Sequence, residues 1–299
     1  MRHIYRRQVK LLLETLPHLY NKQDIAIKGG TAINLFVREM PRLSVDIDLV
    51  YLPIETREKS LANISELMME VARDIQRHVK GTRANFTKHN YKIAVERDGD
   101  IIKIEPNTTL RGAIYPTERK ELCKAAQSEF EVSVFANILS IPDLYGGKLC
   151  AALDRQHPRD LFDIKNLFET EGLTDRIRKA FVVYLAQHNR PPEELLNPNR
   201  LDVSQAYEKE FIGMTNSSVI LDELYETRER LISEISNKMT KEEKLFLVSI
   251  AMGEPNWRLI GNSEIKNFPG IRWKLLNVQK MNEEKKKVAV EKLETCLKL

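Results

Sequence analysis

Two carboxylates separated by a single apolar residue are the strongest candidates for chemistry in this chain. Asp46 and Asp48 alternate with Val45, Ile47 and Leu49, the pattern of a strand with one polar face. Side chains at i and i+2 of a strand point to the same side, so both carboxylates can bind one divalent cation. Mg²⁺ (or Mn²⁺) held by one or two carboxylates, with water and phosphate oxygens as its other ligands, is typical of phosphoryl chemistry. Nucleotide transfer is therefore the first hypothesis.

A glycine turn precedes the carboxylates and supplies the complementary feature. Gly29 and Gly30 follow the short apolar run 25–27, which predicts a buried strand, and they open a predicted helix from Thr31 to about residue 40. A backbone without a Cβ can approach a phosphate closely, and the N-terminus of the following helix attracts the anion. A glycine pair before a helix is more often an ordinary turn. Its combination with Asp46 and Asp48 at this spacing is what favours a phosphate-binding turn.

Two blocks of the chain together resemble a known enzyme family. Gly-Gly-Thr-Ala at 29–32 and Arg-x-Ser-x-Asp-Ile-Asp-Leu at 42–49 resemble motif I of the AbiEii/AbiGii toxin-type nucleotidyltransferases, a branch of the polymerase-β-like superfamily. Lys-Leu-Cys-Ala-Ala-Leu-Asp-Arg at 148–155, followed by Arg-Asp-x-x-Asp at 159–163, resembles the downstream motifs of that family. The resemblance covers roughly residues 1–190.

The resemblance implies roles for the residues that match. The expected catalytic residues are Asp46, Asp48, Lys148, Asp163 and Asp160, and the expected nucleotide-binding residues are Gly29, Gly30, Thr31, Arg42, Ser44 and Lys148. Arg42 and Ser44 are also ordinary turn residues, and without the resemblance Lys148 is more simply a surface lysine. The family pattern favours Asp163 over Asp160 as the catalytic carboxylate.

A third acidic ligand is needed if two metal ions flank the attacking and leaving oxygens. Glu105 ends the predicted strand 101–105, and polymerase-β-like folds place their third carboxylate at a strand end. We expect an antiparallel neighbouring strand to bring Glu105 beside Asp46 and Asp48. An exposed glutamate paired with a basic neighbour is the alternative, and Glu96 is a weaker competitor.

The downstream block predicts two helices. Pro142-Asp143 begins the first, in which Gly146-Gly147 allows close approach to the backbone just before Lys148. On the second helix Asp160 and Asp163 lie three residues apart and therefore share a face. From the residues alone, one of the two can orient an attacking hydroxyl or hold Lys148, and the other can cap the helix.

Composition favours a cytoplasmic protein and excludes a membrane-spanning one. The 299 residues include 47 Lys+Arg and 43 Asp+Glu, a net charge of +4 that permits a nucleic-acid partner without requiring one. Three scattered cysteines, without a Cys-x-x-Cys pair, indicate a reducing compartment. No signal peptide and no span of about 18 apolar residues is present.

Hydrophobic periodicity predicts an α+β fold with two domains. Residues 1–140 alternate helices and strands, including a helix over 56–79, an Asp98-Gly99 hairpin turn and a last strand at 131–134. Residues 141–299 are almost wholly helical, and Trp273 is expected in their core. By resemblance, the first domain is a polymerase-β-like nucleotidyltransferase domain with a mixed sheet flanked by helices. The helical domain then completes the active site and binds the acceptor.

The resemblance also implies a biological role. It predicts an Mg²⁺-dependent enzyme that moves NMP from an NTP to RNA, with the 3′ end of tRNA as the acceptor of some family members. It predicts a toxin of a toxin–antitoxin or abortive-infection pair that is restrained by a separate antitoxin. Transfer to a protein or small molecule, and a non-catalytic RNA- or partner-binding module, are the alternatives.

Overall fold

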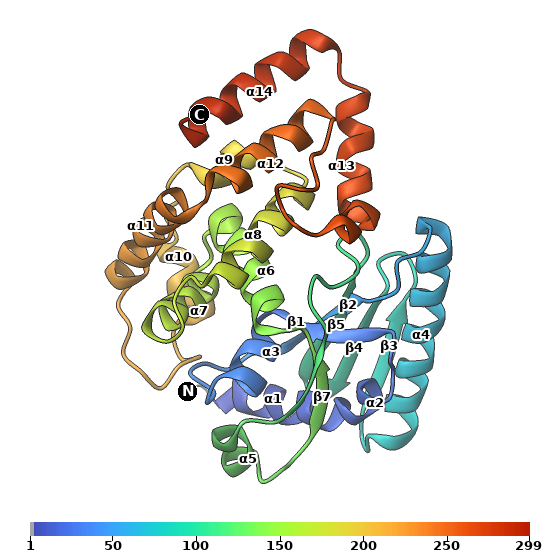
Figure 1. Ribbon diagram of the computed structural model, residues 1–299. Helices are drawn as coiled ribbons and strands as arrows, with labels where there is room; N and C mark the ends of the chain where they lie inside the picture. The colour runs from blue at the N-terminus through green and yellow to red at the C-terminus, as the bar shows by residue number, and fades with distance from the viewer. Residues whose placement is uncertain (1–2) are drawn as a thin grey trace. The chain divides into compact units, whose positions relative to one another are not determined.

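The computed structural model describes residues 3–299, which form two compact units (Figure 1). The first, here the sheet unit, comprises residues 3–140 and 210–218. The second, here the helical unit, comprises residues 141–209 and 219–299. The segment 210–218 comes late in the chain but belongs to the sheet unit, where the Leu43 amide donates to the Met214 carbonyl at 2.8 Å.

The sheet unit is built on a mixed sheet with the strand order β3-β4-β5-β2-β1-β7-β6. β2 lies between β1, to which it is antiparallel, and β5, to which it is parallel. Within residues 3–299 the strands are β1 (Ile25–Lys28), β2 (Asp46–Tyr51), β3 (Arg83–Thr87), β4 (Lys92–Arg97), β5 (Asp100–Asn107), β6 (Glu118–Glu121) and β7 (Phe135–Ile138). The expected α+β class with a mixed sheet is confirmed.

The expected antiparallel pairing of the Asp46 strand with the Glu105 strand is wrong. Helix α4 (Arg57–His78) returns the chain to the end of the sheet at which β2 began, so that β3 starts there. Because β4 is antiparallel to both β3 and β5, β5 runs parallel to β2. The register nevertheless sets Asp48 directly opposite Glu105. Neighbouring residues in register share a face, so the polar face of β2 continues onto β5.

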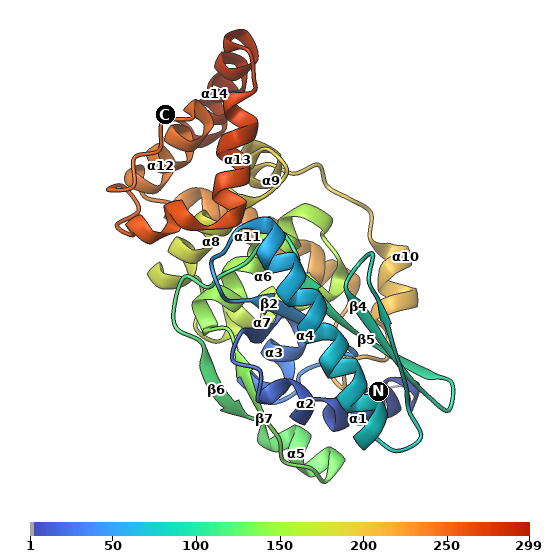
Figure 2. The same ribbon diagram turned by 90° about the vertical axis from the view of Figure 1, so that its right-hand side faces the viewer.

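The opposite face of these strands forms the core of the sheet unit. Alternate residues in the middle of β2, β4 and β5 are fully buried: Ile47, Leu49, Ile93, Val95, Ile102 and Ile104 are all 0% exposed. Helices α1 (His3–Thr15), α2 (Pro17–Tyr20) and α4 pack on β5, β7 and β3 respectively, and Figure 2 shows α4 lying along the strands. Burial of each such side chain contributes about 1.5–3 kcal/mol, which fixes the register and hence the polar face.

The helical unit is organised around the pair α6 (Ile141–Arg155) and α8 (Asp175–Gln187), with α7 (Pro158–Glu169) against α6 and α11 (Leu221–Lys238) against α7. Its other helical elements are α9 (Pro192–Leu196), α10 (Ser204–Ala206), η2 (Tyr207–Phe211, which continues into the sheet unit), α12 (Lys241–Met252), η3 (Ser263–Asn267), α13 (Pro269–Gln279) and α14 (Glu283–Leu297). Across residues 3–299, none of the helices has the length and apolar character needed to cross a membrane.

Three sequence predictions about these elements need correction. Residues 131–134 are not a strand: Glu131, at φ +52°, ends helix α5 (Lys124–Phe130), and β7 begins only at Phe135. The helix expected to reach residue 40 is shorter, because α3 (Gly29–Ala32) passes into a π-helical turn, η1 (Ile33–Val37). Trp273 is not a core residue, since it is 54% exposed on α13.

Candidate active site

The glycine turn and the second carboxylate are in direct contact in the sheet unit. β1 ends at Lys28 and α3 begins at Gly29, whose φ of +70° is unfavourable for any residue with a Cβ. A Cβ on Gly29 would lie 2.6 Å from Oδ2 of Asp48, so the backbone passes against the carboxylate. Because β1 and β2 are antiparallel, with Lys28 opposite Asp48, the turn necessarily lies beside the carboxylate strand.

A buried hydroxyl pair holds the rest of motif I together. The hydroxyl of Thr31, 1% exposed, donates to the backbone carbonyl of Asp46 at 2.5 Å and lies 3.0 Å from the hydroxyl of Ser44, with which it forms a second hydrogen bond. A Cβ on Gly30 would lie 2.7 Å from Nη2 of Arg42 and 3.0 Å from Oγ of Ser44. These residues therefore form one cluster around the first turn of α3, in which Thr31 supports the Asp46 backbone from the buried side.

Replacing Gly29 with alanine is expected to reduce nucleotidyl transfer strongly and to destabilise the fold by about 1–2 kcal/mol, the cost of an L-residue at positive φ. The added methyl group also displaces the Asp48 carboxylate. Gly99→Ala is the matched control, because Gly99 has a φ of +82° and an added Cβ there would have no atom within 4 Å. Thermal unfolding should show losses in both variants, whereas activity should fall only in Gly29→Ala. Equal activity in the two variants would contradict a role of the Gly29–Asp48 contact in nucleotidyl transfer.

The third expected carboxylate lies on the same face but is engaged elsewhere. Glu105 is the register partner of Asp48, and its Oε1 forms an ion pair with Nζ of Lys92 at 2.8 Å. Lys92 comes from β4, where the antiparallel register turns it to the same face. Among residues 3–299, no group of three or more His, Cys, Asp or Glu side chains is arranged as a metal site. The carboxylates on this face of β2 and β5 are thus Asp46, Asp48 and Glu105, with Glu105 held by a lysine.

The downstream motif folds into a buried ion cluster within the helical unit. Nζ of Lys148, on α6, lies 2.8 Å from Oδ1 of Asp160 and 2.9 Å from Oδ2 of Asp163, both on α7. Lys148 is 6% exposed, and Asp160 and Asp163 are each 1% exposed. Nε of Arg155 lies 2.5 Å from Oδ2 of Asp160 and Nη2 lies 3.1 Å from Oδ1, a two-point contact. The spacing of three residues thus directs both carboxylates to one lysine, as their shared helix face predicts.

Electrostatics keep the Asp160 carboxylate of this cluster charged. Burial on its own raises the pKa of Asp160, but attraction to Lys148 and the bonds from Arg155 outweigh it and hold that pKa well below the usual range for aspartate. Two cations and two carboxylates balance in charge, which is the condition under which buried ions persist. His157 rather than Asp160 caps α7, because its ring accepts from the Arg159 amide at 3.1 Å.

The pair Gly146-Gly147 has a structural explanation that sequence reasoning did not provide. A Cβ on Gly146 would lie 2.9 Å from the backbone carbonyl carbon of Ala180, so the close approach expected before Lys148 is made by helix α8. A Cβ on Gly147 would have no atom within 4 Å. The glycine thus lets α6 and α8 pack tightly, which fixes the helix that carries Lys148.

A family model decides the identity of the chain. The model described as "Nucleotidyl transferase AbiEii toxin, Type IV TA system" matches residues 10–275, a span that contains both motif I and the Lys148 block. The chain belongs to the AbiEii nucleotidyltransferase toxin family. The expected family and the expected enzyme class are therefore confirmed.

The fold of this AbiEii family member is also found among solved structures. It is similar to MenT4, a nucleotidyltransferase toxin from Mycobacterium tuberculosis H37Rv, with a TM-score of 0.63 and 14% sequence identity over 92% of each chain. Identity this low shows a shared fold. A search of the curated proteins finds no match to this chain.

Sequence reasoning missed a buried network that borders the Lys148 cluster in this AbiEii family member. Arg228 is 7% exposed on α11, and Gln156 is 1% exposed in the turn between α6 and α7. A signal for Arg228 was present, because it falls in the apolar series Leu224, Leu231, Ile235 at helical spacing. Nothing in the sequence pattern distinguishes Gln156.

Proposed function

We propose that this AbiEii family member is an Mg²⁺-dependent toxin that transfers NMP from an NTP to RNA, with tRNA 3′ ends as the first candidate acceptors. The observation that carries the proposal is the contact between the Gly29 backbone and the Asp48 carboxylate. It joins a backbone suited to phosphate with a carboxylate strand suited to a cation, which is what binding of a metal–nucleotide complex requires.

Asp46 and Asp48 are the proposed metal ligands, with Glu105 as the third. Their donor atoms are all carboxylate oxygens on one face of β2 and β5, a ligand set that suits Mg²⁺ and Mn²⁺ rather than softer metals. When bound, the cation neutralises charge on the phosphates and favours in-line displacement at the α-phosphate. Asp48 is the exposed member of the pair, which supports direct access from solvent.

The remaining residues of motif I are proposed to bind the triphosphate and to shape its site. Gly29 and Gly30 lie at the first turn of α3, and their amides face the phosphate chain in this proposal. Ser44 and Arg42 flank Gly30, so they are placed to add a hydroxyl and a positive charge to the same cradle. Thr31 supports the cradle through its bonds to Ser44 and Asp46.

The ion cluster of the helical unit is proposed to handle the acceptor and the triphosphate charge. Lys148 supplies the positive charge, and Asp163 orients the attacking hydroxyl by accepting its hydrogen bond. Asp160 receives bonds from both Lys148 and Arg155, which supports a role in holding the lysine. This assignment of different roles to Asp160 and Asp163 agrees with the family pattern, which favours Asp163 as the catalytic carboxylate.

Changing Glu105 to glutamine is expected to weaken Mg²⁺-dependent NTP binding and to lower transfer by about 10–100-fold, because a ligand oxygen is lost while side-chain shape is kept. The pair with Lys92 is half-exposed, so its loss costs at most about 1 kcal/mol. Glu96→Gln, on the neighbouring strand β4, is the control. Titration of NTP in the presence and absence of Mg²⁺ measures the effect, and normal binding and activity in Glu105→Gln would remove Glu105 from the site.

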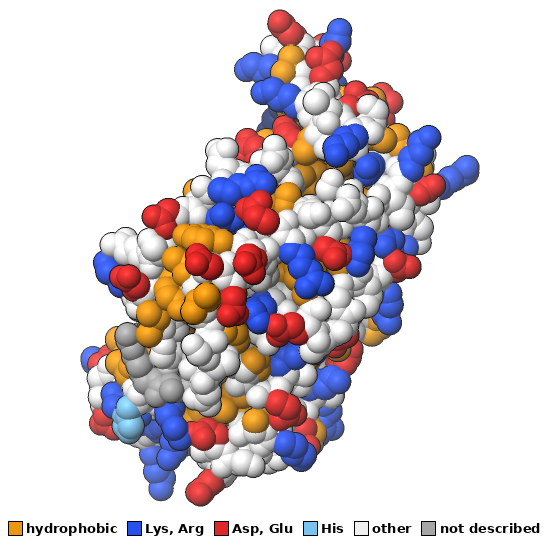
Figure 3. All heavy atoms as spheres, turned by 90° about the vertical axis from the view of Figure 1, so that its left-hand side faces the viewer, with side chains coloured by type: hydrophobic (Ala, Val, Ile, Leu, Met, Phe, Trp, Pro, Cys, Tyr) orange, Lys and Arg blue, Asp and Glu red, His pale blue; other side chains and the backbone are white. Residues whose placement is uncertain are grey.

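The acceptor is tested by supplying each α-labelled NTP with Mg²⁺, first with total tRNA and then with protein alone. Label in RNA with the wild type but not with Asp46→Ala supports the proposal, whereas label on protein supports the alternative acceptor. Equal behaviour of wild type and Asp46→Ala with every acceptor overturns the catalytic proposal. The net charge of +4 fits an RNA partner, although Figure 3 shows acidic and basic side chains intermixed on the face that it displays.

The biological setting completes the proposal. A separate antitoxin that restrains the enzyme is the proposed partner, and membership of a type IV toxin–antitoxin family supports it. The cytoplasm is the proposed compartment, because NTPs and RNA are found there. The cysteines support this assignment: Cys123, Cys150 and Cys296 are all free thiols in the described part of the chain.

A further inference from the structure

The turn between α6 and α7 is very short and conformationally unusual. Only Gln156 and His157 separate the last residue of α6 from the first of α7. Gln156 has a φ of +50°, a region that residues with a Cβ avoid, and it is 1% exposed. Because α6 carries Lys148 while α7 carries Asp160 and Asp163, the conformation of this turn determines how the two helices present the ion cluster.

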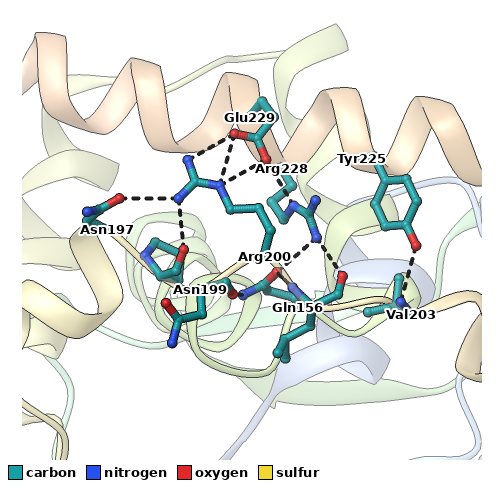
Figure 4. A network of polar contacts seen from close by, with 10 residues as sticks. Gln156, Asn197, Asn199, Arg200, Val203, Tyr225, Arg228 and Glu229 are labelled. Carbon is teal, nitrogen blue, oxygen red and sulfur yellow. Dashed lines mark hydrogen bonds and ion pairs between the residues drawn. The ribbon is translucent and has the colours of Figure 1, made fainter.

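The side chain of Gln156 is bound on both sides of its amide (Figure 4). Nε2 donates to the Asn199 carbonyl at 2.7 Å, and Oε1 accepts from the Leu201 amide at 3.0 Å and from Nη1 of Arg228 at 3.0 Å. These partners come from the segment after α9 and from α11, distant in sequence but within the helical unit. Each contact holds the glutamine in a conformation that its backbone alone disfavours.

Arg228 is a rigid anchor for this turn. Its guanidinium lies 4.7 Å from the centre of the Tyr225 ring, its Nη1 also donates to the Leu201 carbonyl at 2.8 Å, and its Nε bonds Glu229 at 3.1 Å. A buried arginine with several fixed partners has little freedom to move. Arg200, by contrast, is half-exposed and contacts Glu229 on the rim of the same network without bonding Gln156.

We propose that Gln156, anchored by Arg228, is the positioning residue of the Lys148–Asp160–Asp163 cluster. It acts through the turn: Arg155, its immediate neighbour, bonds Asp160 at two points, and His157 is the N-cap of α7. Loss of the amide contacts releases the turn and shifts α7 relative to Lys148. The consequence for catalysis rests on the proposed function, in which this cluster takes part in transfer.

Three variants separate positioning from general stability. Gln156→Gly removes the side chain but tolerates positive φ, so the backbone path is retained. Arg228→Met removes the anchor and keeps an apolar side chain of similar length. Arg200→Ala, which breaks only the rim contacts, is the control. The first readout is the rate at which an acylating reagent modifies Lys148, measured by mass spectrometry. Lys274, whose ammonium donates to the carbonyls of His188 and Arg190, is the internal reporter of general loosening.

We expect the Lys148 modification rate to rise about tenfold in Gln156→Gly and Arg228→Met while that of Lys274 is unchanged. Transfer by these variants should fall, by up to about 100-fold. Arg200→Ala should match the wild type in both readouts. An equal rise at Lys148 and Lys274, or no rise at either, would overturn the positioning role. If no NTP is transferred even by the wild type, the proposed function fails, but the ratio of the two modification rates still decides this inference.

Discussion

Replacing Asp46 with asparagine is expected to lower the rate of nucleotidyl transfer by on the order of 10³-fold or more, with little loss of folding stability. Asparagine keeps the shape of the side chain but removes the charge that a divalent cation requires. The bond from Thr31 reaches the backbone carbonyl of Asp46, so the substitution leaves it intact. Steady-state transfer at saturating NTP and Mg²⁺, together with thermal unfolding, measures both effects.

Asp98→Asn is the matched control for this substitution. Asp98 lies in the hairpin turn between β4 and β5 with a φ of +51°, a conformation that asparagine also adopts readily. Its activity should equal that of the wild type. If Asp46→Asn transferred nucleotide at the rate of Asp98→Asn, the assignment of β2 as the metal-binding strand would be wrong.

Replacing Lys148 with methionine is expected to destabilise the protein by about 3–5 kcal/mol and to abolish transfer, because it removes one partner of a buried ion cluster. Methionine keeps most of the apolar stem, so the loss reports the charge. The carboxylates of Asp160 and Asp163, each about 1% exposed, then lose the lysine that pairs with both, while Arg155 still bonds Asp160. Urea unfolding at about pH 7 measures the change in the free energy of unfolding.

The pH dependence of the stability of Lys148→Met shows whether its loss of stability comes from the missing charge or from altered packing. In the wild type, the pKa of Asp160 is held below its usual value, so its ionised form adds stability above about pH 4 that disappears as the pH falls. Without Lys148, burial is expected to dominate and to raise the pKa of Asp160. The variant should therefore lose stability as the pH rises from about 4 to 7, and its deficit should shrink in acid.

Lys165→Met, on the neighbouring helix α7, is the control for the loss of a lysine side chain. Lys165 pairs with Glu169 at 2.5 Å on a partly exposed face, and an ion pair of this kind contributes at most about 1 kcal/mol. A deficit in Lys148→Met no larger than that in Lys165→Met, or one that does not change with pH, would contradict the description of a charged buried cluster.

The local features of motif I could be predicted from sequence because they depend on short-range rules. Alternation around Asp46 and Asp48 requires a strand with one polar face, and the Asp98-Gly99 pair favours a tight hairpin. Both features are present, as β2 and as the turn between β4 and β5, where Gly99 has a φ of +82°. The shared helix face of Asp160 and Asp163 followed in the same way from a spacing of three residues.

The parts that sequence reasoning missed depend on long-range pairing. β6 consists of four charged residues, Glu118–Glu121, at the edge of the sheet, and no apolar alternation marks it as a strand. β7 lies four residues later than expected because its place is set by pairing with β6 and β1 rather than by its own composition. The direction of β5 relative to β2 likewise follows from the crossover through α4, which periodicity cannot reveal.

Side-chain environments in the helical unit were the least predictable. Lys148 alone resembles any surface lysine, and only folding places it between Asp160 and Asp163. Gln156 gains its importance from contacts with Arg228 and the segment 199–201, all more than forty residues away. Such contacts depend on how helices pack, and packing is not encoded in any single stretch of residues.

The most direct test of the central claim follows the two ends of the triphosphate separately. The protein is incubated with Mg²⁺ and acceptor, in parallel with NTP labelled at the α-phosphate and with NTP labelled at the γ-phosphate. We predict that the α-label moves into the acceptor and the γ-label leaves as pyrophosphate, and that Asp46→Asn does neither. Transfer of the γ-label to the acceptor, or no transfer of the α-label from any of the NTPs to RNA or protein, would contradict the claim that this chain is a nucleotidyltransferase acting through Asp46 and Asp48.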